Sequence, residues 1–163
     1  IEVSAAVRLS NTFSLQGNTS LSRNTFREYT LFDGGSPVSY DGNRIAGFPD
    51  FLTNLRATFE HNSLRATLSL QHVGTQYTDN SEDNRQTLQT RQTPGYDPLI
   101  VDAYTVVSLG LAYDLGRITG SDRFEIRLDI NNLFDRLYET HGEVSSYFPA
   151  ATRNLFVWTR IDL

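Results

Sequence analysis

The 163-residue sequence contains no cysteine and no lysine, so all 14 of its basic residues are arginine. Without cysteine, the chain can form neither a disulfide framework nor a thiolate metal site. No stretch approaches 18 consecutive apolar residues, which excludes a transmembrane helix but leaves open a membrane β-strand, whose signature is only alternation. The net charge of −5 argues against a nucleic-acid partner, which would require a basic patch.

Helical signals are nearly absent as well, since no segment holds a 3.6-residue apolar period over three turns. What the sequence does contain is alternation of apolar and polar residues, in stretches rich in Val, Thr, Phe and Tyr, which favour β-structure. The first alternation begins at the first residue, without a start methionine, so we expect a segment of a longer protein. We predict an all-β chain with strands at residues 1–9, 13–22, 51–60, 64–71, 101–113, 123–130 and 154–163.

The links between these strands alternate strictly between short and long. Short polar or glycine-bearing turns are expected near residues 10–11, 61–63 and 114–122, which suits antiparallel hairpins. The other links, at residues 24–49, 78–98 and 135–153, are far longer than usual connections. One end of the sheet is therefore expected to carry short turns and the other end long loops.

Strand length distinguishes two all-β architectures. Soluble strands typically run about 5–6 residues, whereas ten residues tilted by about 45° span roughly 24 Å, close to the apolar band of an outer-membrane barrel. A soluble antiparallel sandwich is the alternative. Aromatic rows bracket the aliphatic stretches of the apolar phase, as two bilayer interfaces would select, and this favours a membrane sheet. The rows are Phe13, Phe59, Tyr113 and Phe124 at the short-turn end, with Phe51 and Phe134 at the other.

The end of the sixth strand carries a distinctive motif. Residues 129–142 read DINNLFDRLYETHG, and the chain ends in YFPAATRNLFVWTRIDL. This pattern resembles the C-terminal end of TonB-dependent outer-membrane receptors, in which the penultimate strand closes on Asn-Leu-Phe-Asp and a later Arg starts the last strand. The matching positions are Asn132, Leu133, Phe134, Asp135, Tyr138 and Arg153. One departure is Leu163 at the chain end, where the family usually has an aromatic residue.

The resemblance implies an antiparallel transmembrane β-barrel of about 22 strands, of which residues 1–163 would supply the seven C-terminal strands. It also implies a plug domain, a TonB box and the N-terminal barrel strands, all upstream of this chain. Because the family's C-terminus is periplasmic, the short turns would be periplasmic and the long loops extracellular. The polar phase, with residues such as Arg127 and Asp129, would line the lumen and face the plug.

The resemblance further implies a receptor in the bacterial outer membrane that imports a scarce ligand, most often a ferric siderophore, with energy supplied through TonB. Expected partners are membrane lipid, lipopolysaccharide, the plug domain, the TonB complex and the small-molecule ligand. The alternatives are a passive outer-membrane porin, which would have fewer strands and no plug, and a soluble β-sandwich binding module.

Motifs for other chemistry are weak. The three histidines lack metal-ligand spacing, residues 79–84 lack the glycine and glutamate of a calcium loop, and no nucleophile triad or carboxylate pair stands out. We expect no enzymatic activity, cofactor or metal. Ligand contacts are expected in the long loops through bidentate and aromatic interactions, with contact to lipopolysaccharide phosphates or solvent as the alternative. The candidates are Arg85, Arg91, Tyr96 and Tyr147.

Overall fold

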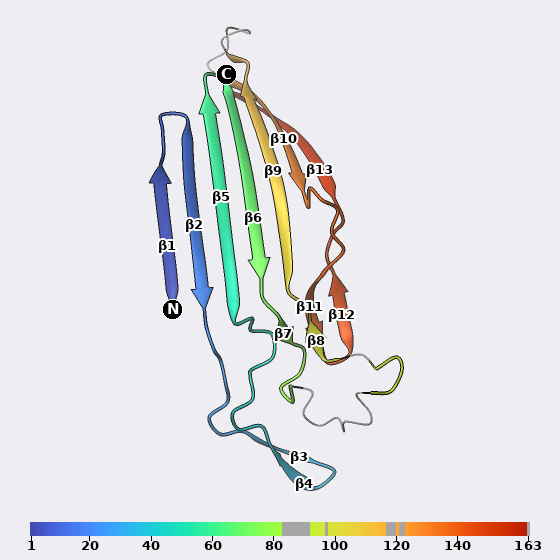
Figure 1. Ribbon diagram of the computed structural model, residues 1–163. Coiled ribbons are helices and arrows are strands. Elements are labelled where there is room, and N and C mark those ends of the chain that lie inside the picture. Colours follow the sequence, from blue (N-terminus) through green and yellow to red (C-terminus); the bar gives the residue numbers. More distant parts are fainter. Residues whose placement is uncertain (83–91, 97, 117–119, 121–122, 163) are drawn as a thin grey trace.

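A computed structural model describes residues 1–163 apart from 83–91, 97, 117–119, 121–122 and 163. Seven long strands form one antiparallel sheet, and each pairs with the next long strand along the chain (Figure 1). These strands are β1 (Glu2–Arg8), β2 (Phe13–Leu21), β5 (Phe51–His61), β6 (Leu64–Val73), β9 (Tyr104–Asp114), β10 (Arg123–Asn131) and β13 (Asn154–Asp162). Each predicted alternation therefore forms one strand of the sheet.

Short and long connections lie at opposite ends of the sheet. The β1–β2 and β5–β6 turns lie at the end where β13 finishes, and the long connections lie at the other end (Figure 1). We call the latter the first long loop (residues 22–50), the second (74–103) and the third (132–153). In the described part of the chain, a helix long and apolar enough to cross a bilayer is absent.

Strand register gives the sheet one apolar and one polar face. On β6, Leu68 lies opposite Ala57 on one side and Leu109 on the other, so the three side chains share a face. Val157 on β13 continues this face and is 69% exposed, and Leu68 is 47% exposed. The register therefore confirms that the predicted apolar phases share one face of the sheet, and the described chain leaves this face uncovered.

The three long loops contain short hairpins that the sequence did not predict. The first holds β3 (Thr30–Asp33) and β4 (Ser36–Ser39), and the second holds β7 (Gln76–Tyr77) and β8 (Ile100–Val101). The third holds β11 (Glu139–Glu143) and β12 (Ser146–Pro149).

One predicted strand was wrong at its start. The alternation was expected to run from Val101, but β9 begins at Tyr104, and Val101 belongs to β8, where it pairs with Gln76. Val101 is 1% exposed because its side chain packs into the loops near Gly142. Burial against a distant segment overrides the local alternation here.

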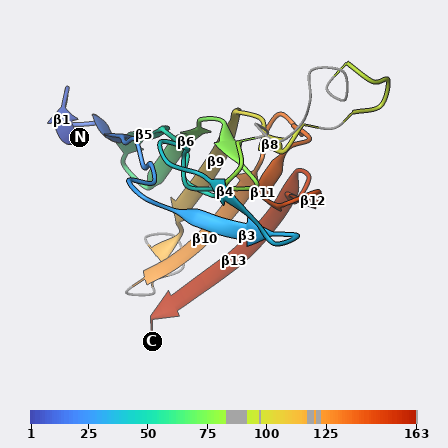
Figure 2. The same cartoon turned by 90° about the horizontal axis from the view of Figure 1, so that it is seen from below.

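The most buried side chains of the described chain lie chiefly among the long loops and at the strand ends beside them. Residues of this kind include Val101, Ser81, Asn132, Tyr40, Thr78 and Gln76, each at most 6% exposed. Figure 2, seen from the loop end, shows a curved sheet with the β3–β4 hairpin passing across its concave side. The densest packing therefore sits outside the long sheet, in the loops.

Candidate functional site

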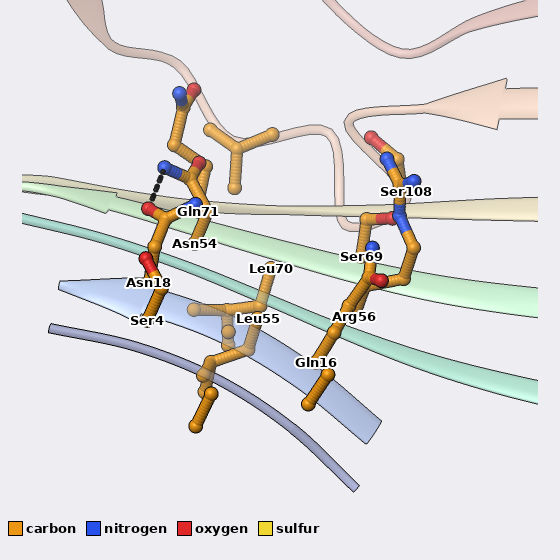
Figure 3. A pocket seen from close by; sticks show the side chains of 14 residues that line it. Ser4, Gln16, Asn18, Asn54, Leu55, Arg56, Ser69, Leu70, Gln71 and Ser108 are labelled. Carbon is orange, nitrogen blue, oxygen red and sulfur yellow. Dashed lines mark hydrogen bonds between the residues drawn. The ribbon is translucent and has the colours of Figure 1, made fainter. Parts of the chain in front are cut away.

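Neutral polar side chains cover the middle of the polar face. They line a cavity of about 730 Å³ on β1, β2, β5, β6 and β9. Figure 3 shows its polar lining, which comprises Ser4, Gln16, Asn18, Asn54, Arg56, Ser69, Gln71 and Ser108. Asn54 Nδ2 donates to Asn18 Oδ1 across 3.1 Å. Of the described residues that line this cavity, only Arg56 is charged, so the surface offers mainly amide and hydroxyl groups.

Charge increases on the same face toward the short-turn end. Glu60 and Arg65 are register partners near the β5–β6 turn, and Arg65 Nε donates to Glu60 Oε1 across 2.6 Å. Glu125 lies opposite Arg160 on β10 and β13. The polar face therefore passes from mainly neutral groups at its middle to paired charges at the short-turn end.

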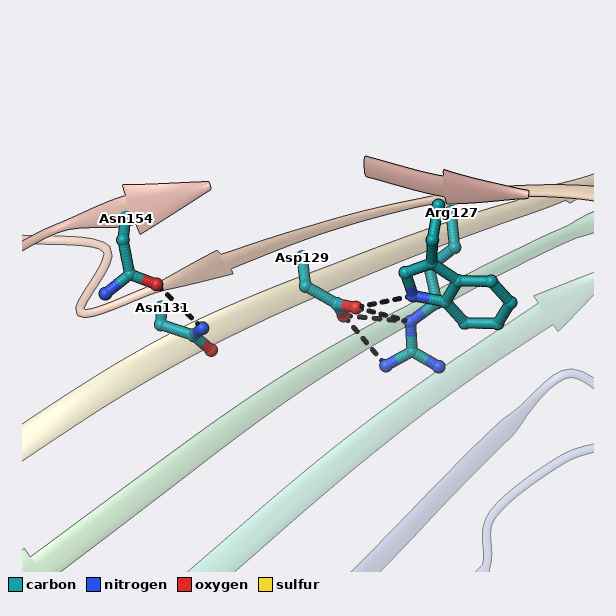
Figure 4. A network of polar contacts seen from close by, with 5 residues as sticks. Arg127, Asp129, Asn131 and Asn154 are labelled. Carbon is teal, nitrogen blue, oxygen red and sulfur yellow. Dashed lines mark hydrogen bonds and ion pairs between the residues drawn. The ribbon is translucent and has the colours of Figure 1, made fainter. Parts of the chain in front are cut away.

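A compact network joins Arg127, Asp129 and Trp158 on β10 and β13 (Figure 4). Arg127 Nε lies 2.8 Å from Asp129 Oδ1 and 3.0 Å from Oδ2, and Arg127 Nη2 lies 2.8 Å from Oδ1. Trp158 Nε1 donates to Asp129 Oδ2 across 3.1 Å, and Arg127 Cζ lies 5.6 Å from the Trp158 ring centroid. The guanidinium is therefore held between a carboxylate and an indole.

Glycine at position 110 makes room for this network. Gly110 is the register partner of Asp129 on β9. A Cβ at this position would lie 3.0 Å from Asp129 Oδ1 and 3.3 Å from Arg127 Nη2. Any larger residue would push the ion pair aside, which gives a local packing reason for glycine in the middle of a strand.

The motif after β10 forms a closed turn. Asn132 is 4% exposed and adopts a left-handed backbone with φ of 50°. Its Oδ1 accepts from the Arg136 backbone N–H across 2.9 Å, and its Nδ2 donates to Arg136 O across 2.8 Å. Nδ2 also donates to Ala151 O across 3.3 Å, which links the turn to the segment before β13. Asn132 thus satisfies backbone groups at the start of the loop, as Asn side chains do in turns.

Other motif residues tie this turn to neighbouring strands. Leu133 N–H donates to Val107 O across 2.7 Å, and Asp135 Oδ1 accepts from the Arg153 N–H across 2.7 Å. The Tyr138 ring centroid lies 4.4 Å from that of Tyr104. Phe134 projects outward and is 74% exposed. The structure therefore brings the motif together as an architectural element at the loop end of β10 and β13.

The base of the second long loop is held by the first. Asn43 Nδ2 donates to Asn80 O across 3.0 Å, and Ala46 N–H donates to Asn80 Oδ1 across 2.9 Å. Arg44 contributes its backbone N–H to Glu82 Oε1 and forms an ion pair with Asp50 across 2.7 Å. Asn80 and Glu82 thus bridge the second loop to the first.

The third long loop packs against the other side of the same base. Thr78 Oγ1 donates to Val144 O across 2.5 Å, and Val144 N–H donates back to Thr78 O across 2.9 Å. Gln76 Nε2 donates to Thr140 O across 3.1 Å. Gly142 lies against Thr78 so closely that a Cβ would overlap Thr78 Cγ2. All three loops are therefore joined through residues 76–82, which we call the loop hub.

The ligand candidates chosen from the sequence fall in different places. Arg85 and Arg91 lie outside the described residues. Tyr96 follows a turn in which its N–H donates to Thr93 O across 3.0 Å. Tyr147 OH donates to Pro98 O across 2.6 Å, which ties the third loop to the second. In the described ranges, no group of three His, Asp or Glu side chains could hold a metal ion.

Sequence reasoning missed the residues of the loop hub. Thr78 and Gln76 are polar, lie outside any long alternation, and acquire their role from Val144 and Thr140, which are more than 60 positions away. No local pattern in one sequence marks such a contact.

Comparison with known proteins gives one family match. The family model described as TonB dependent receptor-like, beta-barrel matches residues 1–133. A search of curated proteins gives no match. The matched range includes the strands from β1 to β10 and ends inside the Asn-Leu-Phe-Asp motif.

Solved structures share the fold at low sequence identity. The siderophore receptor PiuA from Acinetobacter baumannii superposes with a TM-score of 0.73 at 16% identity, covering 97% of this chain and 20% of that one. The ferric yersiniabactin uptake receptor FyuA from Yersinia pestis gives 0.71 at 23% identity, covering 99% and 23%. The ferripyoverdine receptor of the outer membrane of Pseudomonas aeruginosa gives 0.66 at 17%, covering 99% and 19%. The chain thus spans about a fifth of the length of these structures.

Proposed function

The chain belongs to the TonB-dependent receptor β-barrel family, and on that membership we propose that the complete protein actively imports a scarce ligand, with a ferric siderophore as the favoured cargo. The chain is an all-β segment of a barrel that lies in the bacterial outer membrane. The observation that carries the proposal is the family match over residues 1–133. The solved structures with the same fold include receptors for siderophores, which supports the choice of cargo.

The geometry of the two faces supports this proposal. A barrel wall needs an apolar face toward lipid and can carry a polar face toward a wet lumen. The amide- and hydroxyl-lined cavity around Asn18 and Asn54 suits a lumen that a polar cargo crosses. Seven strands would form about a third of a 22-stranded wall.

The remaining partners belong to the same proposal. A plug domain would face the paired charges around Arg127 and Asp129, and the TonB complex would act through an upstream segment. Lipopolysaccharide would surround the long loops. Ligand contact is proposed for Arg85, Arg91, Tyr96 and Tyr147, with the loop hub holding the bases of their loops in place. The proposal assigns no catalytic role to the chain.

Iron uptake in a strain that lacks the full-length gene would test the proposal. Radiolabelled iron would be supplied as ferric citrate and as a panel of purified ferric siderophores, with plasmid-borne full-length receptor restored in cells with and without TonB. Active import predicts uptake of at least one complex only when both receptor and TonB are present. Uptake that needs the receptor but not TonB would instead identify a passive porin.

A further inference from the structure

One row of polar side chains interrupts the apolar face near the long-loop end. Thr19 on β2 lies opposite Thr53 on β5, which lies opposite His72 on β6, which in turn lies opposite Thr105 on β9. Four neighbouring strands therefore place a hydrogen-bonding side chain at the same register position. The row lies within two residues of the loop end of each strand.

The hydroxyl groups of Thr19 and Thr53 satisfy one another. Their Oγ1 atoms are 2.7 Å apart, and Thr53 Oγ1 donates to Asn18 O across 3.0 Å. Because a hydroxyl has one proton, Thr53 must accept from Thr19 when it donates to Asn18 O. The Thr19 and Thr53 hydroxyl protons can therefore lie beside apolar lipid without being left unsatisfied.

His72 leaves one ring nitrogen available. Its Nδ1 lies 2.8 Å from Thr105 Oγ1, and its ring packs 5.4 Å from the Phe51 ring centroid at 54°. When the Thr105 hydroxyl donates to Nδ1, the ring proton lies on Nε2. The side chain thus presents an N–H donor on the outward face beside an aromatic ring, the pairing of polar tip and apolar body found at bilayer interfaces.

The next three register rows of this face are apolar. Moving toward the short-turn end, the next register rows contain Gly17, Leu55, Leu70 and Val107, then Leu15, Ala57, Leu68 and Leu109, then Phe13, Phe59, Ala66 and Leu111. Hydrogen-bonding side chains thus flank these three rows, with the threonine and histidine row at the loop end and with His61 and Tyr113 at the short-turn end. The three apolar rows suit the hydrocarbon core of a bilayer, whereas the row of threonine and histidine suits the headgroup layer.

We infer that Thr19, Thr53, His72 and Thr105 lie at the headgroup level of the outer leaflet, and that His72 Nε2 donates a hydrogen bond to a phosphate oxygen of a lipid headgroup. The inference rests on the location of the chain in the outer membrane and not on ligand import. The occupant is a phosphate-bearing membrane lipid, because the row continues the surface that faces its acyl chains.

Strand tilt sets how sharply depth separates the rows. Ala57 lies four residues from Thr53 on the same face, which corresponds to about 10 Å of depth at a strand tilt of about 40°. Along the row itself, four tilted strands spread the depth by about 9 Å, which exceeds the about 6 Å thickness of one interfacial layer, so the row is centred on that layer and its ends lie at the edges. Labels on one strand therefore give the cleanest comparison.

Nitroxide labels in the full-length receptor would test the depth assignment. Thr53→Cys and Ala57→Cys, each introduced without other cysteines, would be labelled and reconstituted in vesicles of phosphatidylethanolamine and phosphatidylglycerol. The label at 53 should relax the phosphorus NMR signal of the headgroups several-fold more than the label at 57. Equal relaxation, or the reverse order, would overturn the assignment, and neither outcome depends on whether the receptor transports anything.

The His72 contact needs its own variants. His72→Leu keeps an apolar body and removes the N–H donor, whereas His72→Gln retains a donor of similar reach. Native mass spectrometry of the extracted full-length receptor should show severalfold less retained lipopolysaccharide for His72→Leu than for the parent, with most of the loss restored in His72→Gln. Equal lipid retention in all three proteins, or equal loss in both variants, would overturn the headgroup hydrogen bond.

Discussion

The Arg153 backbone N–H donates to Asp135 Oδ1 across 2.7 Å, although 18 positions separate the two residues. Asp135 also adopts a left-handed backbone, with φ of 54°. The same residue therefore closes the turn after β10 and holds the start of β13 against it. The family motif at this place has a mechanical explanation that requires no ligand.

Replacing Asp135 should weaken the junction of β10 and β13. Asp135→Ala removes the acceptor and places a β-carbon in a left-handed backbone, which together should cost about 1–3 kcal/mol. Asp135→Asn keeps both the oxygen acceptor and the tolerance for positive φ, so it should cost much less. Urea unfolding of the full-length receptor in vesicles would measure both. Equal losses for the two variants would contradict the role of the hydrogen bond.

Adjacent residues on β6 should respond oppositely to arginine. Leu68 shares the apolar face with Ala57 and Leu109, whereas Ser69 lines the polar cavity. Leu68→Arg should cost about 2–4 kcal/mol of folding free energy if it lies near the bilayer midplane, and Ser69→Arg should be tolerated far better. Refolding yield and unfolding free energy in lipid vesicles provide the comparison. The opposite order would reverse the facing of the sheet.

Filling the space at Gly110 should disturb the Arg127–Asp129 pair. Gly110→Val would overlap both side chains and should cost about 1–3 kcal/mol, as overpacking usually does. Ser108→Val provides the control, because it adds a branched side chain on the same strand and face beside an open cavity. Unfolding midpoints of the two full-length variants should separate clearly. Identical midpoints would mean that the ion pair shifts at no cost.

Removing the Thr78 hydroxyl should release the third long loop from the loop hub. Thr78→Val keeps the shape of the side chain but loses the donor to Val144 O, whereas Thr78→Ser keeps the donor. Amide hydrogen exchange over β11 and β12 should accelerate in the valine variant and stay near the parent rate in the serine variant. Unchanged exchange in both would show that Gly142 packing alone holds the loop.

The isolated chain should not behave as a soluble domain. Strands β1 and β13 leave two open edges, and Val3 and Val157 on the apolar face are 61% and 69% exposed. Expressed alone, residues 1–163 should aggregate or require detergent, as sizing chromatography would show. A monomeric, cooperatively melting protein without detergent would favour the β-sandwich alternative.

Period-two alternation made the sheet predictable from the sequence. In each long strand, as in residues 123–130, the local alternation decides which side chains share a face. No contact with a distant segment changes that assignment. Val101 shows the opposite case. In the sequence it continues the alternation of β9, but in the structure it lies in the second long loop and packs against Gly142, 41 positions away.

The candidate site was only partly predictable for the same reason. Resemblance located Asn132 and Asp135, and the residue type indicated that the Asn132 amide would satisfy backbone groups at the start of the loop, but only the folded turn shows which backbone groups the two side chains bind. Tyr147 was chosen for its chemistry as a ligand contact, and its hydroxyl already donates to Pro98 O. Side-chain chemistry identifies what a residue can do, whereas contacts between distant loops decide what it is already doing.

The loop hub also orders the events of assembly. Thr78 and Val144 lie on loops separated by the β9–β10 hairpin, and Asn43 and Asn80 lie on loops separated by the β5–β6 hairpin. The first contact needs the β9–β10 hairpin in place, and the second needs the β5–β6 hairpin in place. We therefore expect the three long loops to acquire their native packing after the strands that they connect have paired.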